Sequence, residues 1–160
     1  MNLKSGKRDF LKNGMIFQLA QKWIGGTEGA VSNADISNFS SGQLQEFLDQ
    51  LIMASALSTA AIVKMESEYS SISKSKNSEV RFRWLRVCIK ARHAPCLENA
   101  LQMVTEQGRM KFTRPLYRDL NEWDEVRDRA IQKFKENRKS MHNTTATLVA
   151  KDLKVQATQF

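Results

Sequence analysis

Apolar side chains recur at helical spacing along most of this chain, and the pattern is clearest between residues 44 and 52. The positions i, i+3, i+4, i+7 and i+8, which share one face of an α-helix, hold Leu44, Phe47, Leu48, Leu51 and Ile52. Ser40 lies just before this run, and Gln43 lies three residues after Ser40. This spacing is typical of a capping box, in which each side chain accepts a hydrogen bond from the other residue's backbone. An amphipathic helix beginning at Ser40 is therefore predicted.

The same spacing predicts helices on both sides of this one. The first runs from about Phe10 to Ile24 and ends at two glycines. Later helices are expected to begin at Ser58, at Asn77 or Ser78, near Pro95, at Thr113, near Trp123, and at Asn143 or Thr144. About eight helices with short connections favour an all-α fold built as a layered stack of helical hairpins. The pattern leaves open whether the stack is a bundle or a solenoid.

Composition supports one soluble all-α domain. The 160 residues include only seven Gly and two Pro, which argues against a many-turned β architecture. The net charge of +8 gives a general attraction to polyanions. Nucleic acid is nevertheless an unfavoured partner, because no zinc finger, RNP-type strand or basic zipper is present. No long apolar run predicts a membrane span or signal peptide. Cys88 and Cys96 are expected to be buried reduced thiols, which favours a cytoplasmic location.

Residue types that carry catalysis are sparse. The two histidines, His93 and His142, have no second ligand at the spacing of a zinc motif such as His-Glu-x-x-His. We therefore expect no catalytic residue, no metal site and no cofactor within this chain. Phosphate-binding loops, dinucleotide fingerprints and nucleophile elbows are also missing from the sequence.

The stretch from Gln107 to Pro115 offers a different chemistry. It follows one predicted helix, precedes another, and places Arg109, Lys111 and Arg114 within six residues. A guanidinium can donate two hydrogen bonds to a carboxylate, and an ammonium two residues away adds a second positive charge. Arg109 and Lys111 could thus bind one anionic group together. The alternative is that cations next to a helix C-terminus only interact with the helix dipole.

Three longer segments resemble a known family. They are Asn77-Ser78-Glu79-Val80-Arg81-Phe82-Arg83-Trp84-Leu85-Arg86-Val87-Cys88-Ile89, Glu106-Gln107-Gly108-Arg109-Met110-Lys111-Phe112-Thr113-Arg114-Pro115-Leu116 and Leu148-Val149-Ala150-Lys151-Asp152-Leu153-Lys154-Val155. Together and in this order they are similar to the C-terminal domain of the leukotriene A-4 hydrolase family, bifunctional zinc aminopeptidases and epoxide hydrolases related to aminopeptidase B. Departures include Asn143 and Ala150, where the family usually has proline and glycine.

The resemblance implies a fold and a role. The fold would be a right-handed α-α superhelix, similar to armadillo or HEAT repeats, over residues 10–155, with polar tails at 1–9 and 156–160. Arg109 and Lys111 match the family positions that bind the substrate carboxylate of a peptide or fatty-acid epoxide. The zinc, the catalytic residues and the rest of the cleft would belong to a catalytic domain, in cis or in trans. The alternative is a free-standing α-helical scaffold that binds a partner protein without an enzymatic role.

Overall fold

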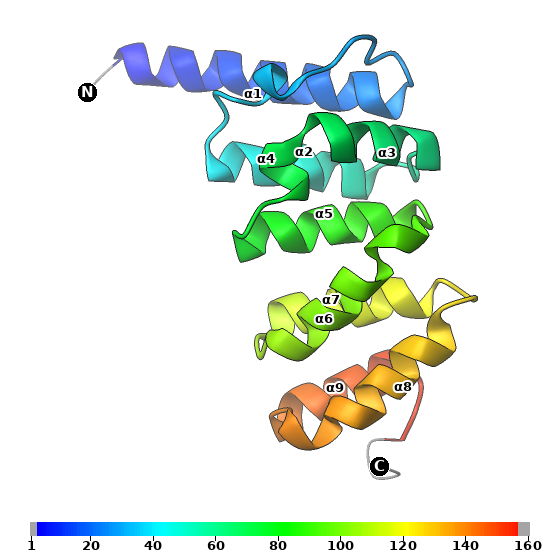
Figure 1. Ribbon diagram of the computed structural model, residues 1–160. Helices are drawn as coiled ribbons and strands as arrows, with labels where there is room; N and C mark the ends of the chain where they lie inside the picture. The colour runs from blue at the N-terminus through cyan, green and yellow to red at the C-terminus, as the bar shows by residue number, and fades with distance from the viewer. Residues whose placement is uncertain (1–2, 157–160) are drawn as a thin grey trace. The chain divides into compact units, whose positions relative to one another are not determined.

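The computed structural model describes residues 3–156, apart from the side chains of residues 3–5 and 7–9, and the regular elements in this range are all helical (Figure 1). The α-helices are α1 (Leu3–Ile24), α2 (Ser41–Met53), α3 (Thr59–Glu68), α4 (Ser70–Ser73), α5 (Ser78–Lys90), α6 (Leu97–Glu106), α7 (Met110–Asn121), α8 (Arg127–Asn137) and α9 (Asn143–Asp152). Short 3-10 helices cover Asn33–Asp35, Ala94–Cys96 and Arg138–Ser140. The all-α prediction is confirmed, and the superhelical arrangement of the whole chain stays a prediction.

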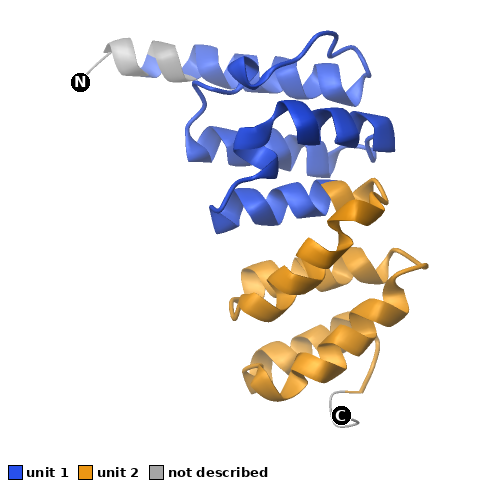
Figure 2. Ribbon diagram, in the orientation of Figure 1, with its two compact units in different colours: residues 1–87 blue, residues 88–160 orange. Residues whose placement is uncertain are grey.

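Two compact units divide the chain, residues 1–87 and residues 88–160, and the division falls within α5 (Figure 2). In the first unit α1 packs along α2, and the core is organised around the fully buried ring of Tyr69. The ring centroids of Trp23 and Phe47 lie 5.5 and 6.3 Å from that of Tyr69, both in edge-to-face geometry. Trp23 Nε1 donates a hydrogen bond to the Tyr69 hydroxyl (3.3 Å), which in turn donates to Asp35 Oδ2 (2.8 Å).

The second unit is organised around α7, which packs against α6, α8 and α9. The face that α7 presents to these helices is apolar and buried at Phe112, Leu116, Tyr117 and Leu120. The Tyr117 ring meets Phe134 of α8 edge-to-face at 6.1 Å. Three helices therefore surround α7. The cationic stretch that the sequence singles out lies at the start of this helix, with Arg109 as the N-cap and Lys111 and Arg114 within the helix.

Helix starts that depend on a serine cap agree with the sequence. Ser40 Oγ accepts from Gln43 N (3.2 Å), and Gln43 Oε1 accepts from Ser40 N (2.9 Å), so the predicted capping box is present. Ser58 Oγ caps α3 by accepting from Ala61 N (3.1 Å). In both cases the two hydrogen-bonded residues are three positions apart, so the cap can be predicted from the sequence alone.

Several helices differ from the prediction. Helix α1 begins at Leu3 rather than near Phe10, α7 at Met110 rather than Thr113, and α8 at Arg127 rather than near Trp123. A short additional helix, α4, forms inside the expected polar loop. Ile72 of α4 is buried, which explains why this polar segment folds onto the core. The last helix is capped by His142, whose Nδ1 accepts from Thr144 N (3.2 Å), rather than by Asn143 or Thr144.

The predicted limits of the helical domain, residues 10–155, stay a prediction. Residues 3–9 of the expected N-terminal tail are helical, and the expected C-terminal tail at 156–160 lies almost entirely outside the described residues. Within the described part of the chain, no helix is both long enough and apolar enough to cross a membrane.

Candidate functional site

The loop between α6 and α7 is short, and its backbone is held at Arg109. This residue has an extended conformation (φ −86°, ψ 122°) and is the N-cap of α7. Its carbonyl oxygen accepts hydrogen bonds from the backbone N–H groups of Phe112 (3.0 Å) and Thr113 (3.2 Å). The Thr113 hydroxyl, which belongs to a buried side chain, donates to the same oxygen at 3.3 Å. These bonds explain why α7 starts at Met110, and they fix where the Arg109 side chain leaves the backbone.

Arg109 and Lys111 lie beside the same aromatic ring. The Cζ atom of Arg109 is 5.5 Å from the ring centroid of Phe112, and the Nζ atom of Lys111 is 4.9 Å from it. Both cationic residues are exposed, whereas Phe112 is buried. Cation–π attraction orients both side chains without changing their formal charge. The structure thus brings together the two residues that the sequence predicted to share one anion.

Phe112 is the member of this cluster that the sequence analysis missed. Its place in the apolar stripe of α7 indicates a core residue, and its ring does pack in the core. The available signal was its spacing, three residues after one cation and one residue after the other. Side chains three residues apart meet on a helix, so the contact of Arg109 with Phe112 had a sequence signal, whereas adjacent side chains such as Lys111 and Phe112 do not normally face each other.

Arg114, the third cation of the stretch, has a different role. Its Nε donates to Asp152 Oδ2 at 2.8 Å, and its Nη2 donates to Asp152 Oδ1 at 3.0 Å. Arg118 adds a third contact to Asp152 Oδ1 at 3.1 Å. Burial alone would raise the pKa of Asp152, but the hydrogen bonds and charges of Arg114 and Arg118 outweigh it and hold that pKa below its usual value. Arg114 therefore joins α7 to α9 and is engaged by a carboxylate of this chain.

Metal chemistry finds no support in the described side chains. No group of three or more His, Cys, Asp or Glu residues in the described range could hold a metal ion. His142 serves as a helix cap, and His93 is buried. Cys88 and Cys96 are both buried and form no disulfide.

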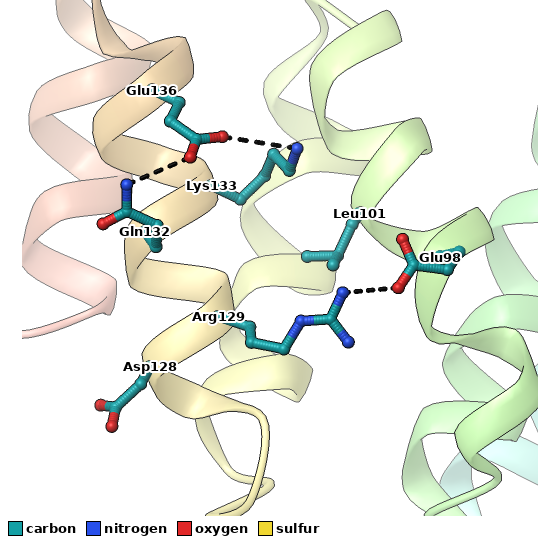
Figure 3. Close-up of a pocket in the computed structure, with 7 residues that line it drawn as sticks. All are labelled: Glu98, Leu101, Asp128, Arg129, Gln132, Lys133 and Glu136. Atoms are coloured by element: carbon teal, nitrogen blue, oxygen red, sulfur yellow. Dashed lines mark hydrogen bonds and ion pairs between the residues drawn. The ribbon is translucent and has the colours of Figure 1, made fainter.

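The second unit also contains an open polar groove of about 470 Å³ between α6 and α8 (Figure 3). Four of the five charged side chains that line it form two ion pairs: Arg129 with Glu98, and Lys133 with Glu136 at 3.5 Å. Gln132 Nε2 also donates to Glu136 Oε1 at 3.1 Å. Neither Arg109 nor Lys111 lines this groove. Because three carboxylates and only two cations line it, the groove is a weaker candidate for binding an anion than the start of α7.

Comparisons with known proteins agree on one family. The family model described as "Leukotriene A4 hydrolase, C-terminal" matches residues 39–153. Leukotriene A-4 hydrolase of Xenopus laevis is 46% identical over 142 residues, which cover 87% of this chain and 23% of the relative. Leucine aminopeptidase 2 of Aspergillus clavatus is 32% identical over 141 residues, covering 87% of this chain and 22% of the relative.

Solved structures give the same result for the fold. The structure of native yeast LTA4 hydrolase superposes with a TM-score of 0.79 at 27% identity, covering 91% of this chain and 26% of that chain. The chain thus spans about a quarter of the length of the relatives that it matches. The matched relatives include enzymes, but the described residues correspond only to their C-terminal helical region. On the family match over residues 39–153 and the 46% identity to a leukotriene A-4 hydrolase, this chain belongs to the leukotriene A4 hydrolase C-terminal family.

Proposed function

We propose that residues 10–155 form a non-catalytic helical domain that walls the substrate cleft of a zinc aminopeptidase-like protein and binds the substrate carboxylate through Arg109, assisted by Lys111. The observation that carries this proposal is the convergence of both cations on the Phe112 ring at the start of α7. The carboxylate belongs to a peptide C-terminus or to a fatty-acid epoxide. The zinc and the reacting groups belong to a catalytic domain supplied in cis or in trans.

The division of labour between the two cations follows from their chemistry. A guanidinium presents paired N–H donors that match the two oxygens of a carboxylate, so Arg109 fixes both the position and the orientation of the bound group. Lys111 contributes a compact charge without a preferred plane. The ring of Phe112 limits the rotamers of both side chains, which lowers the entropy lost when the anion binds.

A chimera tests the role of Arg109. In it, this chain replaces the matched region of the Xenopus laevis relative, and kcat/KM is measured for a tripeptide with a free C-terminal carboxylate and for its C-terminal amide. Arg109→Ala should lower kcat/KM for the carboxylate substrate by about 10- to 100-fold, which corresponds to the loss of charge-assisted hydrogen bonds. The amide substrate should change little. For the carboxylate substrate, kcat/KM of Arg109→Lys should lie between the values of the parent chimera and Arg109→Ala, because lysine keeps the charge but lacks the paired donors.

The matched control is Arg129→Ala, because Arg129 is another exposed arginine of the same unit, and its partner is Glu98. This variant should treat both substrates as the parent chimera does. An Arg109→Ala variant that keeps the parent's preference for the carboxylate substrate would show that the start of α7 does not bind this group.

We also propose a cytoplasmic location. Cys88 and Cys96 are both buried and form no disulfide, which fits a reducing compartment. Fractionation of cells that express the native gene, followed by detection of this chain, tests this location directly.

A further inference from the structure

The exposed large apolar side chains of the described residues concentrate on α1. Phe10 is 79% exposed, Leu11 66%, Met15 56% and Phe17 55%. Elsewhere in the described range only three further large apolar side chains are exposed, and they are scattered over other segments: Met53, Val63 and Met110. Single exposed apolar residues are normal, but four within eight residues of one helix mark an interaction surface.

The four exposed side chains lie on one side of α1 as two pairs, Phe10 with Phe17 and Leu11 with Met15, and the positions between the pairs hold Gly14, Gln18 and Gln21. At 100° per residue, Phe17, Phe10, Leu11 and Met15 fall within an arc of about 160°. The buried residues of the same helix, Ile16, Ala20 and Trp23, occupy an arc of about 60° on the opposite side. The inner face packs along α2, and in Figure 1 the helices α2, α3 and α4 lie on one side of α1, while the loop that carries the 3-10 helix Asn33–Asp35 crosses it.

The comparisons indicate what covers this face. The relatives that match this chain extend well beyond the matched region, since the chain accounts for only 22 to 26% of their lengths. The family match carries the description "C-terminal", so the additional length in those relatives precedes the matched region. Helix α1 lies before residues 39–153, next to that additional part in the order of the chain.

The positive charge of α1 indicates which kind of surface can bind it. The sequence of α1 contains five cationic residues, Lys4, Lys7, Arg8, Lys12 and Lys22, and one acidic residue, Asp9. A second copy of this chain would bring a helix of the same charge against this one, which is unfavourable. A complementary surface has an apolar centre bordered by carboxylates.

We infer that the outer face of α1 (Phe10, Leu11, Met15 and Phe17) docks onto the part of the protein that precedes the C-terminal region in this family, through an apolar patch with an acidic border. This inference rests on the proposed function in that it requires the same catalytic partner. It does not require carboxylate binding at Arg109, because the surface and the cationic cluster involve different residues.

Oxidative footprinting of methionine tests the inference. The oxidation rates of Met15 and Met53 are measured by mass spectrometry in the isolated 160-residue chain and in the chimera with the Xenopus laevis relative. Both side chains are exposed in the chain alone, so both should react there. In the chimera Met15 should react about tenfold more slowly, because susceptibility follows exposure. A Met15 that reacts equally fast in both proteins overturns the inference.

A paired substitution provides a second measurement. Phe10→Glu combined with Phe17→Glu should leave the melting temperature of the isolated chain nearly unchanged, because both side chains already face solvent there. The same pair should lower the melting temperature of the chimera, where it places two carboxylates in a buried interface. Met53→Glu, at a residue that is 86% exposed on α2, is the matched control and should leave both proteins unchanged. Equal effects of the Phe pair on the two proteins contradict the docking surface.

Two other occupants are tested with the isolated chain. Sedimentation equilibrium that shows a dimer, lost in the Phe10→Glu, Phe17→Glu variant, would assign the face to a second copy and overturn the inference. Flotation with vesicles of phosphatidylcholine and phosphatidylserine, but not of phosphatidylcholine alone, would assign it to an anionic membrane and overturn it too. A monomer that binds neither vesicle supports the inference. If only the carboxylate role is wrong, Arg109→Ala will keep the parent's substrate preference while Met15 is still protected from oxidation in the chimera. The two proposals can therefore be rejected independently.

Discussion

Arg114 and Asp152 form a two-point ion pair that joins α7 to α9, with Nε to Oδ2 at 2.8 Å and Nη2 to Oδ1 at 3.0 Å. The Asp152 side chain is 10% exposed. Charge-assisted bonds of this geometry are stronger than neutral ones, and solvent screens them less than a surface pair. The pair therefore helps hold α7 against α9.

Asp152 should make the stability of the second unit depend on pH. Its pKa in the folded chain lies below its ordinary value of 3.8, so unfolding takes up a proton at low pH. The contribution to the free energy of unfolding is fully present above about pH 4 and is lost as pH falls through the folded-state pKa. Asp152→Asn should cost about 1–3 kcal/mol near pH 7 and flatten the pH dependence between about pH 5 and pH 2. Urea unfolding at a series of pH values measures both effects.

Asp124→Asn is the control for this prediction. Asp124 also contacts an arginine, Arg127, but its side chain is 84% exposed, and exposed pairs contribute little to stability. The control should keep the parent's pH profile. If Asp152→Asn keeps the same profile as well, the ion pair with Arg114 does not contribute to stability in solution.

The two buried tyrosines should respond differently to loss of the hydroxyl. Tyr69 accepts from Trp23 and donates to Asp35, so Tyr69→Phe leaves the indole N–H without its acceptor and should cost about 1–3 kcal/mol. The Tyr117 hydroxyl is also buried, but no described residue forms a hydrogen bond with it. Tyr117→Phe should therefore change the free energy of unfolding by less than about 0.5 kcal/mol or be stabilising. Chemical denaturation of both variants measures the difference, and a larger loss in Tyr117→Phe would contradict this account.

Features set by neighbours in the sequence were predictable. The capping box of Ser40 and Gln43 needs only residues three apart, and the apolar stripe from Leu44 to Ile52 needs only the helical period. Of that stripe, Phe47, Leu48 and Leu51 are buried. The grouping of Arg109 with Lys111 also followed from local spacing and chemistry. In each case the interacting residues lie within one or two helical turns of each other in the sequence.

Features set by distant residues were not predictable from one sequence. The partner of Arg114 is 38 residues away, so spacing could not distinguish this cation from its neighbours in the stretch. The burial of Ile72, which draws a polar segment into a short helix, depends on a core that other helices build. The outer face of α1 also escaped prediction, because apolar residues on both sides of a helix do not reveal which side is covered.

The isolated chain should contain no stoichiometric zinc and should not hydrolyse aminopeptidase substrates. A catalytic zinc needs at least three protein ligands and an open position, and the described residues offer no group of three candidate ligands. Elemental analysis of purified, folded chain and an assay with leucine p-nitroanilide test this prediction. The unmodified Xenopus laevis relative provides the positive control. Zinc at one equivalent, or turnover that a chelator abolishes, would contradict the proposed division between this chain and a catalytic domain.

Phe112 should act as a positioning residue for the carboxylate, because its ring lies 5.5 Å from the Arg109 guanidinium carbon and 4.9 Å from the Lys111 ammonium. Phe112→Leu keeps an apolar core residue but removes the π face that orients both cations. In the chimera it should raise KM for the carboxylate tripeptide by about three- to tenfold, leave kcat nearly unchanged, and have little effect on the amide. Phe134→Leu is the matched control, since Phe134 is a fully buried ring of the same unit and should lose similar packing stability. If Phe134→Leu weakens carboxylate recognition as much as Phe112→Leu does, the effect comes from general loosening of the unit, and the ring of Phe112 has no specific role in orienting the two cations.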